Sequence, residues 1–454
     1  MDQKVYDLLD SYREEMTEML KRWVRIPSVR ADAQEGAPFG PDTLRMLQQA
    51  GSDAESLGFP VRYFDGYACD ITLGTAEEKI AVLGHLDVVP VGDGWTRPPF
   101  DAVQEGNRVY GRGTEDDKGP CIAALFAMRA IREAGISLSR RSIRMILGCS
   151  EETEWQDMEY YTAHTEMPEL GFSPDASFPV INTEKGLLQM LLSFADPASG
   201  LRVLELATGD RPNVIPGTCS ARFAGGQDLA DRIHAWSQRT GLPVSAVVEE
   251  GSIRVTADGI PGHAAMPEGR RNAIGMMLSL MKDLGAEGAL RTLASAVGME
   301  YDGRSLGIAC RDEVSGPLTC NIGILRKDGD CWTATLDCRC PITSDLDALL
   351  HTAAEHLPGI DMQVITKKEA HHVPAEGELV SELLAAYEEE TGLKGEAVAI
   401  GGGTYAKVLK QGVAFGALFP DQEELAHQAD EYCDLDSMVK AAKIFANALI
   451  RLTQ

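Results

Sequence analysis

Residues 80–87 decide the fold, and they read Ile80-Ala81-Val82-Leu83-Gly84-His85-Leu86-Asp87. The first five are apolar without interruption, which is typical of a strand that is covered on both faces of a sheet. His85 and Asp87 follow directly, and residues two apart on an extended segment share a face. His85 could therefore bind a metal ion with Asp87 behind its other ring nitrogen, although a purely structural histidine is the alternative interpretation.

The same arrangement recurs at a second apolar run, 143–148, which is followed by Ser150-Glu151-Glu152-Thr153. Adjacent carboxylates are costly to bury unless they meet a metal ion, a proton or a partner. One glutamate could bind a metal ion while its neighbour moves a proton, or both could lie at a solvated strand end. Ligands gather beyond the carboxyl ends of strands in α/β sheets, so both runs point to one site.

Further candidates for the same site are Asp116, Asp175 and His427. Asp116 and Asp117 begin a predicted helix, where they could cap it, but the two oxygens of Asp116 could also bridge two cations. Asp175 lies in a turn, where aspartate is common in any case, and His427 lies in a polar loop and could simply be exposed. A set of His, Asp and Glu side chains is one that Zn²⁺ accepts.

Strands and helices alternate from residue 60 to residue 186, which indicates an α/β sheet with covering helices. Residues 187–373 hold many short alternating strands, and from about residue 375 the first pattern returns. We therefore predict a catalytic domain built from residues 1–186 and 374–454, with an inserted α+β domain at 187–373. Helices are predicted at 1–24, 43–57, 120–134, 271–284, 346–356, 379–391 and 436–452, and a strand at 413–419.

Bulk properties exclude several classes of partner. The net charge of −27 over 454 residues disfavours nucleic acid and anionic membranes, since both require clustered Lys and Arg. No apolar run approaches the ~20 residues that span a bilayer, and the amino terminus lacks the pattern of a signal peptide. The ten cysteines are scattered without a Cys-x-x-Cys pair, so we expect reduced thiols and a cytoplasmic protein.

Six strings occur in a characteristic order, namely GHLDVVPVGDGW, GRGTEDDKGP, SEETEW, PDASFPVINTEKG, GGGTYAK and AHQADEY. Together they resemble the co-catalytic zinc metallopeptidase family of aminoacylases, carboxypeptidase G and carnosinases. The resemblance spans the chain from about residue 20 to its end. It is strongest to the PepV-type bacterial dipeptidases, whose inserted domain has a similar length.

The resemblance implies a fold and a set of metal ligands. The fold is an α/β zinc-peptidase catalytic domain, with a mixed sheet covered by helices, plus the inserted α+β lid domain. Two Zn²⁺ ions are implied, although the ligands also suit Mn²⁺ or Co²⁺. Glu151 resembles the general base, Asp87 the residue behind the histidine, and the Asp116–Asp117 peptide bond is implied to be cis. The implied ligands are His85 and Asp175 on one ion, His427 and Glu152 on the other, and Asp116 between them.

The resemblance also implies residues on the substrate side, each with an ordinary alternative. His263 is similar to a histidine that steadies the reaction's oxyanion, although it could be an ordinary surface histidine. Arg339 resembles an arginine that binds the peptide's terminal carboxylate, and otherwise it forms a rim salt bridge. Asn213 would assist Arg339. Gly402 and Gly403 would let backbone amides approach that carboxylate, although a glycine loop alone is nonspecific.

The expected activity is hydrolysis of dipeptides by metal-activated water with Glu151 as the base. The first alternative is an N-acyl-amino-acid amidohydrolase of the same family. The second is a non-catalytic zinc-binding protein, which the absence of cysteine from the implied ligand set disfavours. A small peptide is the expected partner, and we expect a monomer.

Overall fold

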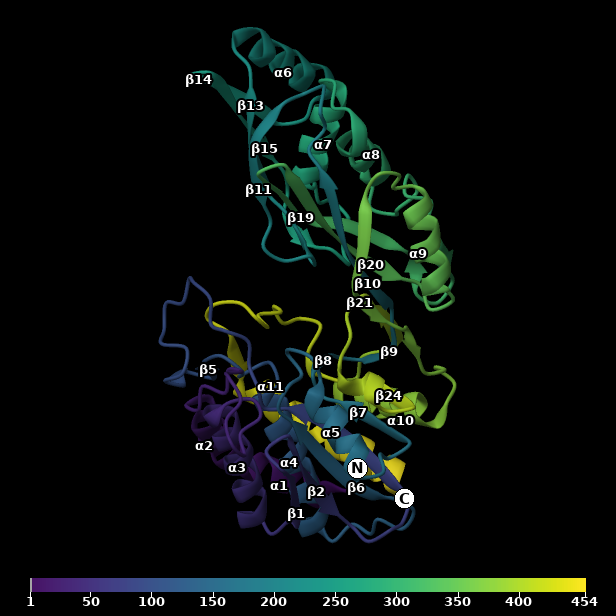
Figure 1. Ribbon diagram of the computed structural model, residues 1–454. Helices are drawn as coiled ribbons and strands as arrows, with labels where there is room; N and C mark the ends of the chain where they lie inside the picture. The colour runs from purple at the N-terminus through teal and green to yellow at the C-terminus, as the bar shows by residue number, and fades with distance from the viewer. Residues whose placement is uncertain (1) are drawn as a thin grey trace. The chain divides into compact units, whose positions relative to one another are not determined.

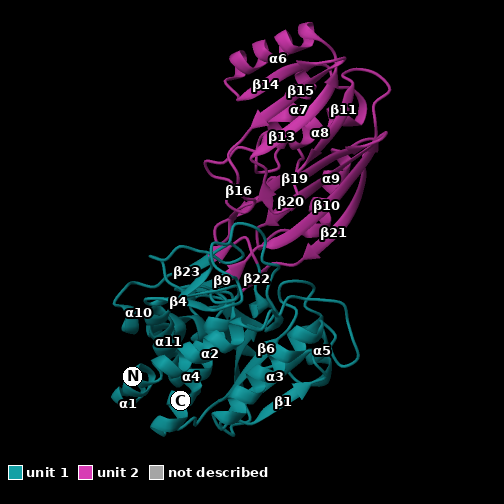
Figure 2. Cartoon of the chain, turned by 90° about the vertical axis from the view of Figure 1, so that its left-hand side faces the viewer, with its two compact units in different colours: residues 1–182, 373–398, 403–454 teal, residues 183–372, 399–402 magenta. Residues whose placement is uncertain are grey.

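The chain forms two compact units in the computed structural model, which describes residues 2–454. The first unit comprises Met1–Asn182, Val373–Val398 and Gly403–Gln454, and the second comprises Thr183–His372 and Ala399–Gly402 (Figure 2). The insertion therefore begins after residue 182 rather than 186, and ends after 372 rather than 373. The four residues 399–402 join the second unit, which the sequence did not predict.

A nine-stranded mixed sheet forms the centre of the first unit (Figure 1). Its strands β6, β3, β7 and β24 are parallel neighbours, and antiparallel strands flank them on both sides. The order is β1 (Val61–Phe64), β2 (Ala68–Leu73), β6 (Ser142–Gly148), β3 (Lys79–His85), β7 (Leu170–Ser173), β24 (Gln411–Ala414), β9 (Val180–Glu184) and β22 (His371–His372), with β23 (Ala397–Ile400) paired to β9.

Strand β3 is buried on both faces, as its apolar run predicts. Ile80 and Val82 belong to the main core, whereas Ala81 and Leu83 belong to a smaller cluster on the opposite face. The main core takes side chains from α1 (Gln3–Ser11), α2 (Arg13–Val24), α3 (Pro41–Ser56), α4 (Lys118–Ala134), α10 (Glu378–Thr391) and α11 (Leu435–Thr453). The smaller cluster takes them from α5 (Gln156–His164) and η1 (Tyr405–Val408). Because both faces of the sheet are covered, a site can form only beyond the ends of its strands.

Two predicted elements of the first unit are interrupted. The helix predicted at 1–24 is two helices, α1 and α2, which meet at Tyr12. The strand predicted at 413–419 ends at Ala414 and resumes as β25 (Ala417–Leu418), because Gly416 turns the chain with a φ of 78°. Helix α4 ends as predicted, since Gly135 occupies its left-handed C-cap position.

The second unit is an antiparallel eight-stranded sheet with helices packed on it (Figure 2). Alternate residues of strand β10 (Gly186–Ala195) are buried, and the core of this unit contains Phe194 and Trp332. The order is β14 (Val244–Glu249), β15 (Ser252–Asp258), β13 (Thr218–Ala224), β11 (Val203–Thr208), β19 (Thr319–Asp328), β20 (Cys331–Cys340), β10 (Gly186–Ala195) and β21 (Asp361–Lys368).

Four helices accompany this sheet, namely α6 (Gln227–Thr240), α7 (Ala273–Asp283), α8 (Gly288–Val297) and α9 (Leu346–Glu355). The sequence predicted α7 and α9 but not α6 or α8. Helix α6 buries only Ala230, Ile233 and Trp236, a narrow apolar stripe among polar residues. The predicted fold class, an α/β catalytic domain with an inserted α+β domain, is confirmed. Within residues 2–454, none of the helices has the length and apolar character to cross a bilayer.

Candidate metal centre

His85 lies at the carboxyl end of β3, with its side chain fully buried. Its Nε2 is 2.9 Å from Oδ1 of Asp116 and 3.4 Å from Oδ2 of Asp175. Its Nδ1 is 3.0 Å from the backbone oxygen of Asp87 and 3.4 Å from the carboxylate of that residue. One imidazole nitrogen therefore faces the predicted ligands, and the other is held from behind by Asp87.

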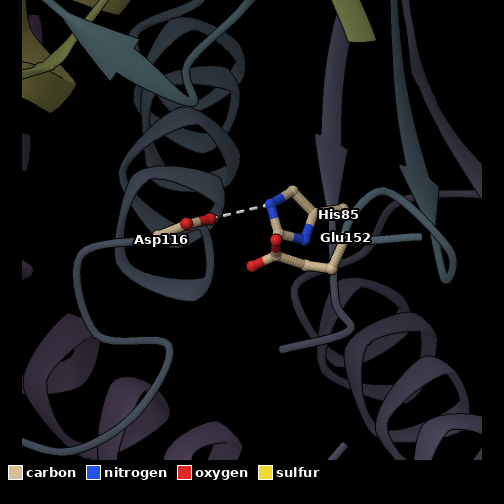
Figure 3. A group of neighbouring side chains, drawn as sticks. All are labelled: His85, Asp116 and Glu152. Atoms are coloured by element: carbon tan, nitrogen blue, oxygen red, sulfur yellow. Dashed lines mark hydrogen bonds and ion pairs between the residues drawn. The ribbon is translucent and has the colours of Figure 1, made fainter. Parts of the chain in front are cut away.

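Asp116 stands between the two predicted histidines. While its Oδ1 faces His85, its Oδ2 lies 3.0 Å from Nε2 of His427. The same Nε2 of His427 lies 3.0 Å from Oε1 of Glu152. In Figure 3 the side chains of His85, Asp116 and Glu152 point toward a common space. The structure thus brings together predicted ligands from four separate segments of the first unit.

Glu151 and Glu152 sit in a turn that follows β6, and Asp87 fixes this turn. The amide of Glu151 donates to Oδ1 of Asp87 and the amide of Glu152 to Oδ2, each over 3.1 Å. The indole of Trp155 donates to the backbone oxygen of Glu151 over 2.8 Å. The sequence predicted Asp87 behind the histidine, but its carboxylate also holds the backbone of both glutamates.

Asp117 does not cap the helix that it begins. It occupies the N-cap position of α4, yet its side chain bonds to none of the helix amides. Its Oδ2 instead accepts a hydrogen bond of 3.1 Å from the backbone amide of His85. The capping interpretation is therefore wrong for Asp117, whose carboxylate positions the end of β3. The peptide bond between Asp116 and Asp117 is cis, as the resemblance implies.

The electrostatics of this cluster call for a cation. Hydrogen bonds that the His427 imidazolium donates to the carboxylates of Asp116 and then Glu152 raise the pKa of His427 to about 11. Burial raises the pKa of Glu152 to about 7, with the charge of Asp116 adding to the effect. Burial also opposes ionisation of Asp116, but the two imidazoles outweigh it and lower its pKa. Such crowding of carboxylates in a partly buried space is costly unless positive charge neutralises it.

The donor set fits divalent metal ions. Two overlapping triads, His85–Asp116–Glu152 and His85–Glu151–Asp175, each bring their ligand atoms within 4.8 Å of one another. Imidazole nitrogens and carboxylate oxygens suit Zn²⁺, Mn²⁺ and Co²⁺ alike. His427 is 43% exposed, whereas His85 is fully buried, so the cluster is reached from the side of His427.

Two residues of the predicted substrate side meet in the second unit. Strand β12 (Val214–Ile215) pairs with β16 (Gly262–His263), which places Val214 opposite His263. The amide of Ala264 donates to the backbone oxygen of Asn213 over 2.9 Å. Asn213 and His263 therefore lie on adjoining backbones, and the side chain of His263 accepts from the amide of Ala265 over 3.2 Å.

Arg339 lies on β20 and already has an acidic partner. Its Nε donates to Oδ1 of Asp337 over 2.7 Å, and a terminal nitrogen donates to Oδ2 over 3.1 Å. Its other terminal nitrogen donates to the backbone oxygen of Gly401. A Cβ on Gly401 would lie 2.5 Å from that of Ala265, so only glycine fits there. Gly402 belongs to the same loop in the second unit, while Gly403 belongs to the first unit.

Sequence reasoning missed several residues that support the site. Asp337 was not predicted, although its spacing of two from Arg339 on a strand was a usable signal. Glu115 and Glu431 stand inside the quoted strings, but no role was assigned to them. Both carboxylates hold backbone amides beside predicted ligands. Their contacts could not be read from the sequence, because they join segments far apart in the chain.

The comparisons with known proteins identify the family of the chain. Residues 81–451 match peptidase family M20/M25/M40, and the chain belongs to this family. The resemblance inferred from the sequence strings is therefore confirmed.

Two relatives align with nearly the whole chain. YtjP of Bacillus subtilis (strain 168), whose dipeptidase name is provisional, is 34% identical over 457 residues, which cover 97% of this chain and 98% of the relative. Beta-Ala-Xaa dipeptidase of Lactobacillus delbrueckii subsp. lactis is 31% identical over 467 residues, covering 100% and 99%. Human carnosine dipeptidase 1 has a TM-score of 0.63 at 14% identity, with 100% of this chain and 98% of that chain covered. At such identity the last likeness shows the fold alone.

Proposed function

We propose that this chain is a dinuclear metallodipeptidase that acts at the cluster around Asp116. The observation that carries the proposal is the position of the Asp116 carboxylate, whose two oxygens face the Nε2 atoms of His85 and His427 at 2.9 and 3.0 Å. A carboxylate that presents one oxygen to each of two imidazoles has the arrangement that a bridging ligand requires. Membership of a peptidase family and the name of the Lactobacillus relative support peptide hydrolysis.

The proposed ligands divide into two sets that share Asp116. His85 and Asp175 would hold one ion, and Glu152 and His427 would hold the other. When bound, a pair of divalent ions would polarise the scissile carbonyl and lower the pKa of the attacking water. Zn²⁺ is the expected metal, and the same donors suit Mn²⁺ and Co²⁺.

Glu151 is proposed as the general base. Its carboxylate lies in the triad with His85 and Asp175, and burial raises its pKa. A carboxylate with a raised pKa is a stronger base, so it takes a proton from the attacking water more readily. Glu151 would then pass that proton to the leaving nitrogen as the amide bond breaks. The hydrogen bond from its backbone to Asp87 keeps the side chain in place during both transfers.

The inserted domain, predicted at 187–373, is proposed as a lid that supplies the substrate side. His263 would donate a hydrogen bond to the oxyanion of the tetrahedral intermediate. Arg339 would bind the terminal carboxylate, with Asn213, Gly402 and Gly403 beside it. The bidentate bond to Asp337 would orient the guanidinium and leave part of its donor fork for the substrate.

A substrate panel on stripped and metal-loaded protein tests the proposal. We expect dipeptides to be hydrolysed, the activity to vanish with a chelator, and Zn²⁺, Mn²⁺ or Co²⁺ to restore it. Undiminished dipeptide hydrolysis by the metal-free protein would contradict the proposal. Preference for an N-acetyl amino acid would instead indicate an acyl-amino-acid amidohydrolase, and bound metal without turnover of any amide would indicate a non-catalytic protein.

A further inference from the structure

Glu431 is a buried carboxylate close to the candidate metal centre that takes no part in the proposed ligand set. Its Oε2 accepts a hydrogen bond of 2.6 Å from Arg112, and both side chains are almost fully buried. Arg112 also donates to the backbone oxygen of Val91 over 3.2 Å, and its guanidinium lies 5.2 Å from the ring of Trp95. Because the two charges of a buried ion pair are costly to desolvate, the pair contributes little net stability to the fold, which favours a positioning role for it.

The other oxygen of Glu431 holds the backbone on which Asp116 sits. Oε1 accepts from the amide of Glu115 over 2.9 Å and from the amide of Asp116 over 3.3 Å. The backbone oxygen of Glu431 accepts in turn from the amide of Gly111 over 2.9 Å. One residue thus ties the end of the His427 loop to the segment that carries the proposed bridging ligand.

Glu115 makes the reciprocal connection. Its Oε1 accepts from the amides of Leu425 and Ala426, each over 3.1 Å. These two residues directly precede His427, whereas Glu431 follows it in the same loop. The Glu115 carboxylate therefore holds the backbone just before His427. The Glu431 carboxylate, which comes after His427, holds the backbone of Glu115 and Asp116. We call the carboxylates of Glu115 and Glu431 the loop clamp.

We propose that Glu115 and Glu431 are positioning residues that fix the distance between Asp116 and His427. The inference rests on the proposed function, because that distance matters only if both side chains hold one ion. Metal ligands must stand within about 0.5 Å of their productive geometry, and supporting hydrogen bonds supply that precision. The contact of 3.0 Å between Asp116 and His427 spans two segments that are far apart in sequence, and the loop clamp joins both backbones directly.

The test is a titration of metal-free protein with Co²⁺ alone. Calorimetry and the visible absorption of the bound ion monitor the binding. Glu431→Gln cannot accept from Arg112 and from the two amides at once, since one oxygen becomes an amide donor. We expect this substitution to lower the affinity for one of the two Co²⁺ ions by about 10- to 100-fold and to alter the absorption spectrum of that ion. Glu115→Ala should have the same effect, whereas Glu115→Gln, which keeps the accepting oxygen, should restore binding.

Asp430→Asn is the matched control. Asp430 neighbours Glu431 in the loop, and its carboxylate bonds to Thr96 and Arg97 rather than to the metal-binding segments. Its φ of 56° is one that asparagine tolerates, so this variant should bind both ions as the wild type does.

The outcomes separate the inference from the proposed function. Wild-type affinity for both ions in Glu115→Ala would overturn the loop clamp even if Glu431→Gln failed to fold. Equal weakening in Glu115→Ala and Glu115→Gln would also overturn it, because the hydrogen bonds would then not be the cause. A wild-type chain that took up no Co²⁺ would overturn the proposed function itself, and the inference with it.

Discussion

Asp87 holds Glu151 by its backbone, since the amide of Glu151 donates to Oδ1 of Asp87 over 3.1 Å. The second oxygen of the same carboxylate accepts from Glu152. Asp87 also approaches Nδ1 of His85, at 3.4 Å. One buried side chain therefore sets the position of a proposed ligand histidine, a proposed ligand glutamate and the proposed base. Asp87 therefore connects the end of β3, where His85 lies, to the turn after β6, where Glu151 and Glu152 lie.

Asp87→Asn should weaken metal binding and turnover together. The substitution replaces one accepting oxygen with an amide donor that would face the backbone amide of Glu151 or Glu152. Loss of such a supporting contact typically lowers metal affinity or activity by about 10- to 100-fold. Metal titration and steady-state kinetics measure both effects. Asp93→Asn, at an exposed position in the following loop, serves as the control. An Asp87→Asn variant with wild-type affinity and turnover would refute this role.

Glu151→Ala should keep both metal ions and lose most turnover. The proposed base is not among the proposed ligands, and a positioned general base contributes about 10²- to 10⁴-fold to rate. Metal content after dialysis and kcat on a dipeptide separate the two properties. Glu154→Ala, two residues beyond the proposed ligand Glu152 and exposed, is the comparison. Retained turnover in Glu151→Ala would remove Glu151 from the base role.

Arg339→Ala should raise KM for dipeptides with a free carboxylate more than for dipeptide amides. A charge-assisted hydrogen bond contributes about 1.5 to 3 kcal/mol, which corresponds to roughly 10- to 100-fold in binding. A dipeptide amide has no terminal negative charge to pair with Arg339, so the KM for the dipeptide amide should change little. Arg326→Ala on the neighbouring strand β19 provides the control, since that arginine pairs with the exposed Asp210. Equal changes for both substrates would show that Arg339 acts on the fold rather than on the carboxylate.

Lys118 should make the free energy of unfolding depend on pH above neutrality. Its side chain is fully buried, with Nζ donating to the backbone oxygens of Trp23 and Ile26. Burial lowers its pKa to about 7, so between pH 7 and 10 the unfolded chain binds the proton that the folded chain has lost. Stability then rises with pH in this window, by up to about 1.4 kcal/mol per pH unit.

Urea unfolding of the metal-free wild type and of Lys118→Met at pH 7.5 and 9.5 measures this effect. The difference in free energy of unfolding between the two proteins should grow in favour of the wild type at the higher pH. Lys79→Met, at a half-buried lysine whose ammonium donates to Glu77, should show no such growth. A gap between wild type and Lys118→Met that is the same at both pH values would contradict the prediction.

Local sequence predicted the elements that bury apolar residues in a regular pattern. The run from Ile80 to Gly84 became a strand with one core on each face, and Gly135 ended α4 where its left-handed conformation is needed. Helix α6 escaped prediction because tertiary packing requires only three buried side chains there. The break at Gly416 escaped because it depends on a backbone angle that apolar composition does not reveal.

The candidate site could be predicted as a set of residues but not as a set of contacts. Strand ends and family strings identified His85, Asp116, Glu152, Asp175 and His427, which the structure brings together. The same reasoning treated Asp117 as a possible cap, whereas its carboxylate holds the backbone of His85. Side chains that bind backbone amides across the fold, such as Glu431, leave no periodic signal, so only the tertiary structure reveals them.

The number of metal ions bound by the wild type and by His427→Ala tests the central claim most directly. His427 is 43% exposed, so its removal should leave the fold intact while it takes one ligand from one of the two ions. After loading with Zn²⁺ and dialysis, elemental analysis should find two ions per chain in the wild type and one in His427→Ala. The same zinc content in both proteins, or no more than one ion in the wild type, would contradict the account.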